Sequence, residues 1–406
     1  MKNSHEGSQK PATLLHIATV PMSLTFLRGQ AEFMRSHGLR MHALSSPGAD
    51  LETFGDRESV EVHGVRMTRE ITPVADLRAL VGIRRVLGIL KPEIVHAHTP
   101  KAGLLGMMAA SAGGPSVRIY QMRGLPLLTS SGAKRWTLRQ AERVSCGLAD
   151  LVICNSHSLR RTAIAEGLCH PEKIKVLGGG SGNGVEARRK FSPDALPPDA
   201  RSRTRERFGI PSEAIVLGFV GRIAREKGVI ELVEAWRRFR EENTQAHLLI
   251  VGPYEERDPI STSTRAILEG DPRVHLAGMD WDTPPLYAAM DLIVLPTYRE
   301  GFPNVLLEAA AMRLPVIATR VEGCVDAVQD GVTGILIPPR NSAALYEAIH
   351  TYGKKPEMRA AHGSAGRTRA LHDFRPEKIW ELYLHEYSRL CAEKRFPVPK
   401  TMYQAA

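Results

Sequence analysis

The segment LIVLPTYREGFPNVLLEAAAM, residues 292–312, shows how this chain is built. Its first five residues are continuously apolar, as in a strand of a parallel sheet that is covered on both faces. Residues 304–312 follow with the apolar content of a buried helix, and Gly301 lies in the turn between them, where the lack of a Cβ permits tight backbone geometry. Asn304 is a residue type that commonly caps a helix. The segment predicts a strand, a tight turn and a helix whose first amides lie beyond the strand end.

Short apolar runs alternate with helical stretches along the whole chain, as they do in this segment. Besides residues 292–296, we expect strands at residues 13–19, 41–45, 94–97, 117–120, 151–154, 174–177, 215–220, 247–251, 274–276, 316–319 and 334–337. Repeated strand–helix alternation is typical of doubly wound α/β folds with parallel sheets. The sequence therefore predicts an α/β architecture from one end to the other.

The division into domains follows from the length and from one run that resembles a linker. A chain of 406 residues is long enough for two domains of about 150–200 residues each. Residues 194–206 lie in a stretch rich in proline and charge, and they separate residues 1–193 from residues 207–375. We expect these two parts to be Rossmann-like domains that face each other across a cleft. Residues 376–406 are expected to contain a helix that crosses back to the first domain.

The composition favours a globular, cytoplasmic protein. Apolar residues make up 43% of the chain and charged residues 24%, as in proteins with a packed core. No stretch reaches the roughly 20 apolar residues of a membrane helix, and the polar N-terminus lacks the layout of a signal peptide. The five cysteines are scattered, which favours free thiols in a reducing compartment.

The positive charge is concentrated in the first half of the chain. The net charge is +10, and residues 1–200 hold 26 Lys and Arg against 17 Asp and Glu. A basic half indicates an anionic partner such as nucleic acid, a membrane leaflet or a phosphorylated substrate. The helix expected over residues 134–143 carries four of these cations. They form either a solvated face or a contact for lipid head groups or an acceptor diphosphate.

Two carboxylates and two cations are the strongest candidates for a binding site. Glu300 precedes the helix described above and Glu308 lies on its second turn, so both can accept hydrogen bonds from sugar or ribose hydroxyls. Arg222 and Lys227 follow the apolar run at residues 215–220, where an Arg fork and a mobile Lys charge can flank a diphosphate. A helix N-terminus also stabilises phosphate oxygens. We therefore expect a leaving diphosphate to be neutralised without a metal and without another cofactor.

The pairing of Gly-Arg-x4-Lys at residues 221–227 with Glu-Gly-x-Pro-x4-Glu at residues 300–308 resembles the retaining family 4 glycosyltransferases of the GT-B fold. The loops VHAHTPKAG at residues 95–103 and NGV at residues 183–185 match further loops of that family. The stretch YQMRGLP at residues 120–126 is similar to a subgroup from capsule, exopolysaccharide and lipid-linked glycan pathways. Members of that subgroup extend a sugar that is carried on a polyprenyl diphosphate.

The resemblance implies a role for each matching residue. Arg222 and Lys227 would bind the donor diphosphate. Glu308 would hold the ribose hydroxyls, whereas Glu300 and His98 would contact the donor sugar near the reacting carbon. The other donor contacts expected are Gly301, Phe302, Pro303, Asn304 and Val305, and the acceptor contacts expected are Ser23, Lys101 and Arg123. Residues 19–24 (TVPMSL) replace the double glycine that the family usually has after its first strand, so the contacts of this loop differ here.

Two further motifs carry less weight. Asp280 and Asp282 have the two-carboxylate spacing of metal-dependent, single-domain glycosyltransferases, but the Thr-Pro-Pro that follows them favours a helix start. The glycine-rich residues 178–184 do not match the Gly-x-Gly-x-x-Gly of a dinucleotide site. Neither motif supports a metal or a dinucleotide cofactor.

Together these observations predict a glycosyltransferase that moves a hexose or N-acetylhexosamine from a nucleotide-diphosphate sugar, by family habit a UDP-sugar, to an anionic lipid-linked or oligosaccharide acceptor. A GT-B sugar-nucleotide epimerase or phosphorylase is an alternative. A basic nucleic-acid-binding protein is a more distant one, because only 6% of the residues are aromatic and no reading motif is present. We expect no nucleic-acid partner and a cytoplasmic protein whose basic first domain contacts the inner membrane leaflet peripherally.

Overall fold

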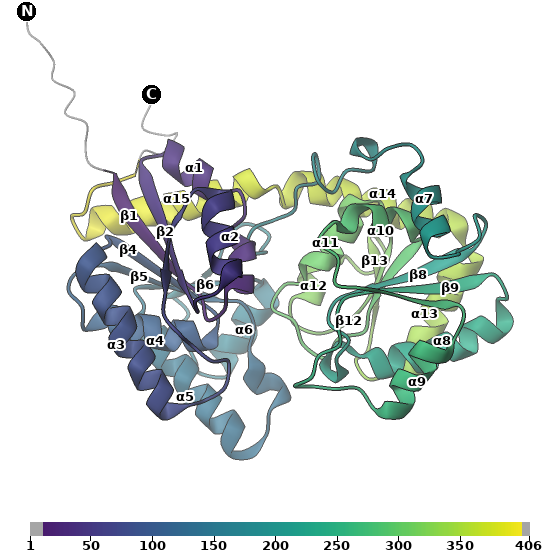
Figure 1. Cartoon of the computed structure of the whole chain (residues 1–406), viewed down its shortest axis with the longest axis horizontal. Coiled ribbons are helices and arrows are strands. Elements are labelled where there is room, and N and C mark those ends of the chain that lie inside the picture. The colour runs from purple at the N-terminus through teal and green to yellow at the C-terminus, as the bar shows by residue number, and fades with distance from the viewer. Residues whose placement is uncertain (1–10, 400–406) are drawn as a thin grey trace, which may run out of the picture. The chain divides into compact units, whose positions relative to one another are not determined.

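The computed structural model describes residues 11–399 and divides the chain into two compact units (Figure 1). Unit 1 contains the residues up to Asn155, Leu159–Gly178 and the segment from Pro376 onward, whereas unit 2 contains Ser156–Ser158 and Gly179–Arg375. The polypeptide thus leaves unit 1 near Gly178 and returns to it at Pro376.

Unit 1 is built around a seven-stranded parallel sheet with the strand order β3-β2-β1-β4-β5-β6-β7. Its strands are β1 (Ala12–Ile17), β2 (Leu39–Ser45), β3 (Glu61–Gly64), β4 (Ile94–His98), β5 (Val117–Met122), β6 (Leu151–Cys154) and β7 (Ile174–Val176). The helices between them are α1 (Gln30–Ser36), α2 (Ala49–Glu58), α3 (Pro73–Leu90), α4 (Pro100–Ser111), α5 (Gly132–Leu148) and α6 (His157–Ala165). Because the central strands are apolar on both faces, helices cover both sides of the sheet.

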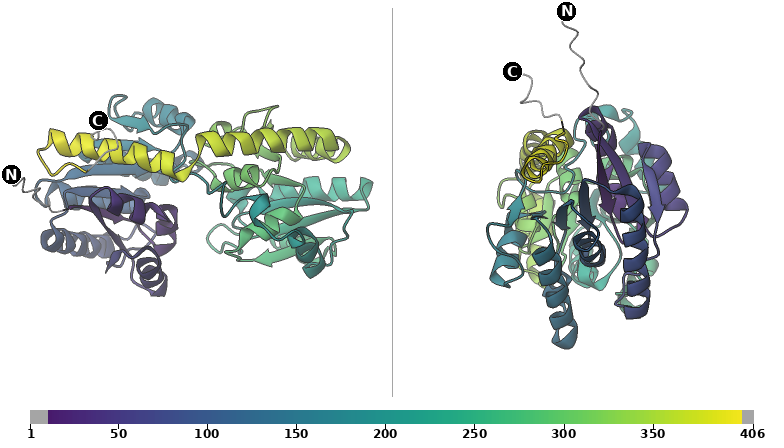
Figure 2. Two further views of the ribbon diagram at one scale, coloured as in Figure 1. Left: turned by 90° about the horizontal axis from the view of Figure 1, so that it is seen from above. Right: turned by 90° about the vertical axis from the view of Figure 1, so that its left-hand side faces the viewer.

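The last helix of the chain, α15 (Pro376–Glu393), belongs to unit 1, where it contacts α1 and β5. Figure 2 shows it running beside the sheet of unit 1. Its residues Trp380, Tyr383 and Tyr387 are buried and join the apolar cluster that includes β1, β4 and β5. This helix therefore completes the core of the unit that the first half of the chain builds.

Unit 2 contains a six-stranded parallel sheet with the strand order β10-β9-β8-β11-β12-β13. Its strands are β8 (Ile215–Val220), β9 (Ala246–Val251), β10 (Val274–Gly278), β11 (Leu292–Leu295), β12 (Val316–Thr319) and β13 (Gly334–Ile337). The helices are α7 (Ala200–Arg207), α8 (Val229–Glu242), α9 (Thr262–Gly270), α10 (Thr283–Ala289), α11 (Asn304–Ala311), α12 (Cys324–Ala327), α13 (Ser342–Lys354) and α14 (Pro356–Asp373). Both sheets are doubly wound, which confirms the predicted fold class.

In each unit the strand order reverses at one place. The reversal lies between β1 and β4 in unit 1 and between β8 and β11 in unit 2. Neighbouring loops diverge there, so ligands of open α/β sheets bind beyond the carboxyl ends of these strands. Most candidate residues lie at or after the ends of strands at these reversal points, whereas Arg123 follows the neighbouring strand β5.

Residues 194–206, predicted as a linker, are a folded part of unit 2. They contain most of α7, and the side chain of Arg205 in that helix is buried. Its guanidinium donates hydrogen bonds to the Ala289 carbonyl at 3.0 Å and to the Asp291 carboxylate at 2.9 Å. The chain passes from unit 1 to unit 2 earlier, near Gly178. The charged residues of the stretch at 194–206 therefore stabilise a helix of unit 2 and do not form an unstructured linker.

No helix within residues 11–399 combines the length and the apolar character that crossing a bilayer requires.

Candidate active site

The donor-site candidates of unit 2 lie beyond the ends of two paired strands. Strand β8 pairs with β11 in parallel, so the loops that follow them start at the same edge of the sheet. Arg222 and Lys227 are in the loop after β8, and Glu300 is in the loop after β11. Pairing of the two strands therefore brings together residues that are more than 70 positions apart in the sequence.

Lys227 and Glu300 form an ion pair, with Lys227 Nζ donating to Glu300 Oε1. Their side chains are only 17% and 14% exposed, so solvent screens the pair less than it screens a surface pair. The Lys227 ammonium has further hydrogen atoms to donate, and the second Glu300 oxygen remains an acceptor. A cation and a hydrogen-bond acceptor thus lie side by side where the strand order of unit 2 reverses, between β8 and β11.

Gly228 makes this pairing possible. Its φ is +71°, and a Cβ at this position would overlap the Pro296 carbonyl at the end of β11. Only glycine lets the start of α8 approach β11 this closely. The close approach positions Lys227, which precedes Gly228, against the loop that carries Glu300.

Arg222 is held by two carboxylates that the sequence analysis did not single out. Its guanidinium donates to Glu255, and it also donates to Glu226 Oε1 at 3.0 Å. Glu226 in turn pairs with Arg299. Burial of Glu226 opposes its ionisation, but the charges of Arg299, Lys227 and Arg222 outweigh burial and lower the pKa of this carboxyl. Arg222 is therefore fixed in the loop while 40% of its side chain stays exposed.

Helix α11 begins at Asn304, and Pro303 occupies the capping position with no side-chain cap. Asn304, expected to be the cap, is instead the first helical residue, and its Oδ1 accepts from the Ser181 hydroxyl at 3.5 Å. Without a cap, the amides of Asn304 and Val305 are not consumed by a capping side chain. Phe302 before them is buried and contacts the ring of Phe374, with ring centroids 5.4 Å apart. The loop is thus anchored by an aromatic contact, and its helix N-terminus stays available to an anion.

Glu308 lies on the second turn of α11, where its Oε2 accepts a hydrogen bond of 2.8 Å from the Tyr287 hydroxyl. Burial and the neighbouring Glu308 charge raise the pKa of Tyr287 well above its usual value, so the phenol remains a donor. Tyr287 is a positioning group that the sequence analysis missed, because it lies on α10, in a stretch that contains no recognisable motif. It orients the Glu308 carboxylate.

In unit 1, His98 is buried at the end of β4 and lies between Arg123 and His16. Arg123 Nη2 is 3.2 Å from His98 Nδ1, and His98 Nε2 is 2.8 Å from His16 Nδ1. Arginine can only donate, so His98 Nδ1 accepts and its proton lies on Nε2, from which it is donated to His16. Burial, followed by the charges of His96, Arg123 and His16, lowers the pKa of His98 well below its usual value. His98 is a neutral imidazole with both nitrogens engaged.

His96, two residues earlier on β4, is tied to α15. Its Nδ1 lies 2.7 Å from the Tyr387 hydroxyl, and its Nε2 lies 3.1 Å from Gln121 Oε1. The Tyr383 hydroxyl donates to the same Gln121 oxygen at 3.0 Å. Both polar atoms of the buried His96 ring are satisfied, one by Tyr387 of the last helix and the other by Gln121 of β5, so His96 has a structural role.

The three acceptor candidates lie in different surroundings. Arg123 contacts His98 and also lies over the Phe26 ring, 4.7 Å from its centroid. Lys101 at the start of α4 forms an ion pair of 2.6 Å with Asp76, and its side chain is 11% exposed. Ser23 lies in a 3-10 helix, Pro21–Leu27, that replaces the expected loop after β1. The structure thus brings Arg123 next to His98, whereas the Lys101 charge is balanced by Asp76.

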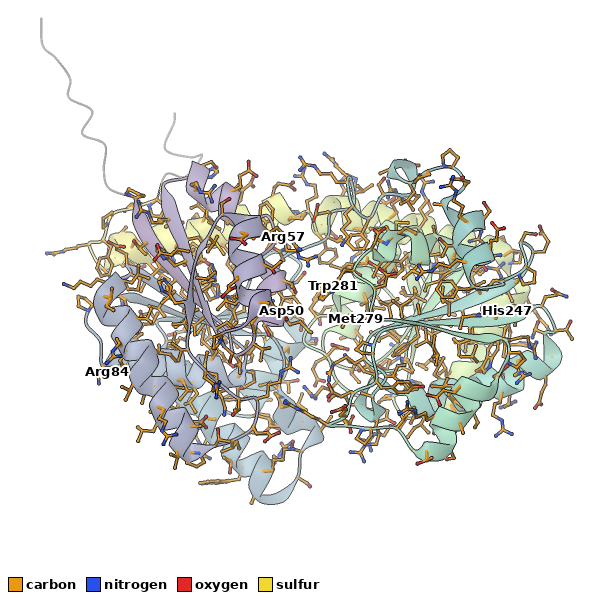
Figure 3. The ribbon with its side chains drawn as sticks, in the orientation of Figure 1. Asp50, Arg57, Arg84, His247, Met279 and Trp281 are labelled. Carbon is orange, nitrogen blue, oxygen red and sulfur yellow. The ribbon has the colours of Figure 1, made fainter. Side chains whose placement is uncertain are left out.

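Asp280 and Asp282, discounted as a metal motif, follow β10. Asp280 accepts from the backbone amide of Asp282 at 2.9 Å and pairs with Arg207 at 3.6 Å. Figure 3 labels their neighbours Met279 and Trp281, which are about half exposed. The Asp280 carboxylate is thus engaged in turn formation and in a surface ion pair.

Two family models match the chain. One, described as a glycosyl transferase 4-like domain, matches residues 24–180, and the other, described as glycosyl transferases group 1, matches residues 214–354. The first match lies in the part of the chain that supplies His98 and Arg123. The second contains Arg222, Lys227, Glu300 and Glu308.

Relatives of known name agree with these matches. Over 373 residues the chain is 34% identical to the capsular polysaccharide biosynthesis glycosyltransferase CapM of Staphylococcus aureus, covering 92% of this chain and 96% of that protein. Over 264 residues it is 27% identical to the UDP-Gal:alpha-D-GlcNAc-diphosphoundecaprenol alpha-1,3-galactosyltransferase of Escherichia coli, covering 64% and 66% of the two chains. Among solved structures, HepE of Anabaena in complex with UDP-glucose shares the fold, with a TM-score of 0.76, 21% identity and coverage of 93% and 99%.

Proposed function

This chain belongs to the family 4 glycosyltransferases of the GT-B fold, and we propose that it transfers a hexose or N-acetylhexosamine from a UDP-sugar, with retention, to a polyprenyl-diphosphate-linked glycan. The product would be a precursor of a capsule or another surface polysaccharide. One observation carries the donor part of the proposal. Lys227 in the loop after β8 forms an ion pair with Glu300, which lies in the loop between β11 and α11.

The donor diphosphate would bind to Arg222, Lys227 and the first amides of α11. These groups supply positive potential without a metal, and their positions are fixed before the substrate arrives. Glu308, oriented by Tyr287, would accept hydrogen bonds from the ribose hydroxyls. Glu300 would accept hydrogen bonds from the sugar through the oxygen that Lys227 does not occupy.

Transfer would proceed on one face of the sugar. The acceptor oxygen forms its bond to the anomeric carbon while the bond from that carbon to the diphosphate oxygen breaks, and the electron pair of that bond stays on the leaving UDP. The proton of the acceptor hydroxyl moves to the leaving phosphate, so a side-chain base is not needed. For His98 to contact the sugar through its ring, Arg123 or His16 must first release the nitrogen that it engages.

Replacing Lys227 with alanine tests the donor site. We expect K227A and R222A to lose roughly 10²–10³-fold in turnover, because each removes a cation from the developing diphosphate charge. Transfer is measured from UDP-sugars to a polyprenyl-diphosphate sugar, and the anomeric configuration of the product is read by NMR. R225A is the matched control, because the Arg225 side chain lies in the same turn, is 66% exposed and pairs with Asp258. Near-normal turnover in K227A, with the fold intact by circular dichroism, contradicts the assignment.

We propose an anionic membrane leaflet as the surface at which the acceptor is met. Helix α3 of unit 1 exposes four apolar side chains to between 59% and 78%, and these are Val74, Leu77, Val81 and Ile89. The exposed residues Arg78 and Arg85 lie on the same helix face, since residues three, four and seven positions apart share a side of a helix. An apolar stripe flanked by cations fits an anionic lipid surface.

The neighbouring helices extend this surface. Helix α4 contacts both α3 and α5, so the three helices lie next to one another on one side of the sheet (Figure 1). Trp136 on α5 is 65% exposed beside the exposed Lys134. Arg135 and Arg139 of that helix, in contrast, are hydrogen-bonded to Glu166. Figure 3 labels Arg84 on the outer side of α3.

Vesicle binding tests the leaflet contact. We expect the wild-type chain to sediment with vesicles containing anionic phosphatidylglycerol and to bind less to neutral phosphatidylcholine vesicles, with binding that weakens as salt rises. The double variant L77S/V81S should bind several-fold more weakly, because it interrupts the stripe. V332S, a change at an exposed residue of unit 2, serves as the control. Equal binding of L77S/V81S and wild type would place the contact elsewhere.

A further inference from the structure

Three potential metal ligands project from the edge of the unit 1 sheet. His42 lies on β2, and its register partner on the edge strand β3 is Glu61. His63 lies two residues after Glu61, so all three side chains are on the same face of the sheet. None of them belongs to the site described above, and β3 is a strand that the donor and acceptor assignments do not use.

The two imidazole nitrogens are spaced as a tetrahedral ion requires. Zinc binds imidazole nitrogen at about 2.0–2.1 Å, which puts two such nitrogens about 3.3 Å apart in a tetrahedral site. His42 Nδ1 and His63 Nε2 are 3.2 Å apart. Oxygens of Glu61 lie 3.7 Å from the first nitrogen and 4.0 Å from the second. These two distances belong to different Glu61 oxygens, so the exposed Glu61 side chain must rotate or move to bring one oxygen within tetrahedral distance of both nitrogens.

The two imidazoles are prepared to act as ligands. Burial lowers the pKa of His42 and of His63, while the charge of Glu61 opposes this effect in both. The hydrogen bond between His42 Nδ1 and His63 Nε2 places a proton on one of these two nitrogens, and an ion bound there would displace that proton. The carboxylate of Glu61 supplies the negative charge that offsets Arg40, the nearby cation.

A cavity of about 420 Å³ opens onto two of the three residues, and Arg40 also lines it. His42 and Glu61 line it, together with Ser59 and Arg35. Arg35 is directed to backbone carbonyls, donating to Ser59 at 2.9 Å. The cavity leaves space for a water molecule as the fourth ligand.

Two other histidine groups lack these properties. His16, His96 and His98 also lie close together, but no carboxylate joins them and Arg123 donates into the group, which disfavours a cation. His247 and His275 on β9 and β10 form the corresponding pair in unit 2, with nitrogens 2.9 Å apart, but no third ligand joins them. Figure 3 labels His247. The group on β2 and β3 is therefore the one, among the described residues, in which two imidazoles and a carboxylate converge.

We propose that His42, His63 and Glu61 bind one Zn²⁺ ion in a tetrahedral site with water as the fourth ligand. The ion would tie the edge strand β3 to β2, and so it would stabilise unit 1. The inference goes beyond the proposed transfer reaction, which uses no metal, and it does not depend on that reaction. The role is structural, because none of the candidate donor or acceptor residues is among the ligands.

Metal binding by the whole, tag-free chain tests the proposal. After treatment with a chelator and its removal, wild type should bind one equivalent of Zn²⁺ in isothermal titration calorimetry, and Zn²⁺ should raise its melting temperature. Co²⁺ should bind at the same site with the intense visible absorption of a tetrahedral complex. H63A and E61Q should each lower the affinity for Zn²⁺ at least about 100-fold, because even the loss of an outer partner of a metal ligand costs 10–100-fold.

The control is H275A, which removes one imidazole of the pair in unit 2 and should leave Zn²⁺ affinity unchanged. Circular dichroism checks that each variant folds, and E61Q keeps the size of the side chain in case H63A does not fold. The proposal is overturned if wild type shows no saturable Zn²⁺ binding, or if E61Q and H63A bind as tightly as wild type. Since no sugar substrate is present, these outcomes are independent of the outcome of the transferase experiments.

Discussion

Glu142 on α5 is a carboxyl group enclosed by the core of unit 1. Its Oε2 accepts a hydrogen bond of 2.8 Å from the Tyr120 hydroxyl. Burial raises the pKa of Glu142 to about 7, and the hydrogen bond only partly opposes that effect. Tyr120 itself packs against Gly103 of α4, where a Cβ would overlap its ring. A single buried acid thus joins two helices and a strand.

The raised pKa of Glu142 predicts how stability depends on pH. The folded form holds its proton up to about pH 7, whereas the unfolded carboxyl loses it near 4.5. The group therefore destabilises the fold progressively as pH rises from 4.5 to 7, by about 3 kcal/mol in total. We expect E142Q to gain stability relative to wild type at pH 8 and to show little difference at pH 4.5. Urea unfolding of both proteins at the two pH values measures this, and an equal difference at both contradicts it.

At the candidate donor site, the sequence predicted the charged groups but not all of the side chains that contact them. The sequence points to Arg222, Lys227 and Glu300 because each lies in a short motif, and the spacing of residues within a motif can be read from neighbouring positions. Glu226 lies four residues after Arg222 and is local in the same sense, whereas Glu255, 33 positions away, becomes a partner of Arg222 only through the fold. The same holds for Tyr287, whose role depends on Glu308 of another helix.

At the scale of elements, the turn between β8 and α8 depends on Gly228. Its φ is +71° and its Cα faces the Pro296 carbonyl. Gly209, after α7, has a similar φ of +65° but no atom close to the position of a Cβ. The two glycines thus separate the cost of backbone strain from the cost of a steric clash.

Substituting these glycines gives a matched prediction. G209A should lose roughly 1–3 kcal/mol of stability from the left-handed φ alone. G228A should lose clearly more, because the added methyl group must also displace the end of β11. The free energy of unfolding from urea denaturation measures both losses. Equal losses would mean that the turn relaxes around the methyl group without cost.

Strand β3 is the one strand of the described residues that the sequence did not predict. All twelve predicted strands are present, with ends that differ by up to two residues. β3 (Glu61–Gly64) is an edge strand whose residues are polar or half-buried, so it lacks the continuous apolar run by which the others were recognised. The polar residues that make this strand hard to recognise in the sequence are Glu61 and His63, two of the proposed metal ligands.

At the scale of the whole molecule, the two-domain α/β fold follows from patterns that repeat along the chain. Apolar runs and helical stretches report the local environment of each element, so they predict the fold class directly. The position of the boundary is not local information. Residues 179–206 join unit 2 because buried groups such as Arg205 find partners there, and composition alone does not reveal such partners.

The return of the chain to unit 1 at Pro376 has a consequence for synthesis on the ribosome. All of unit 2, Gly179–Arg375, is translated before α15 exists, and α15 supplies buried residues to the core of unit 1. Domains generally fold as units while the chain emerges. The second unit can therefore mature first, whereas the first unit keeps part of its sheet uncovered until α15 has left the ribosome. Newly made chains thus depend on a late segment to protect the part that was made first.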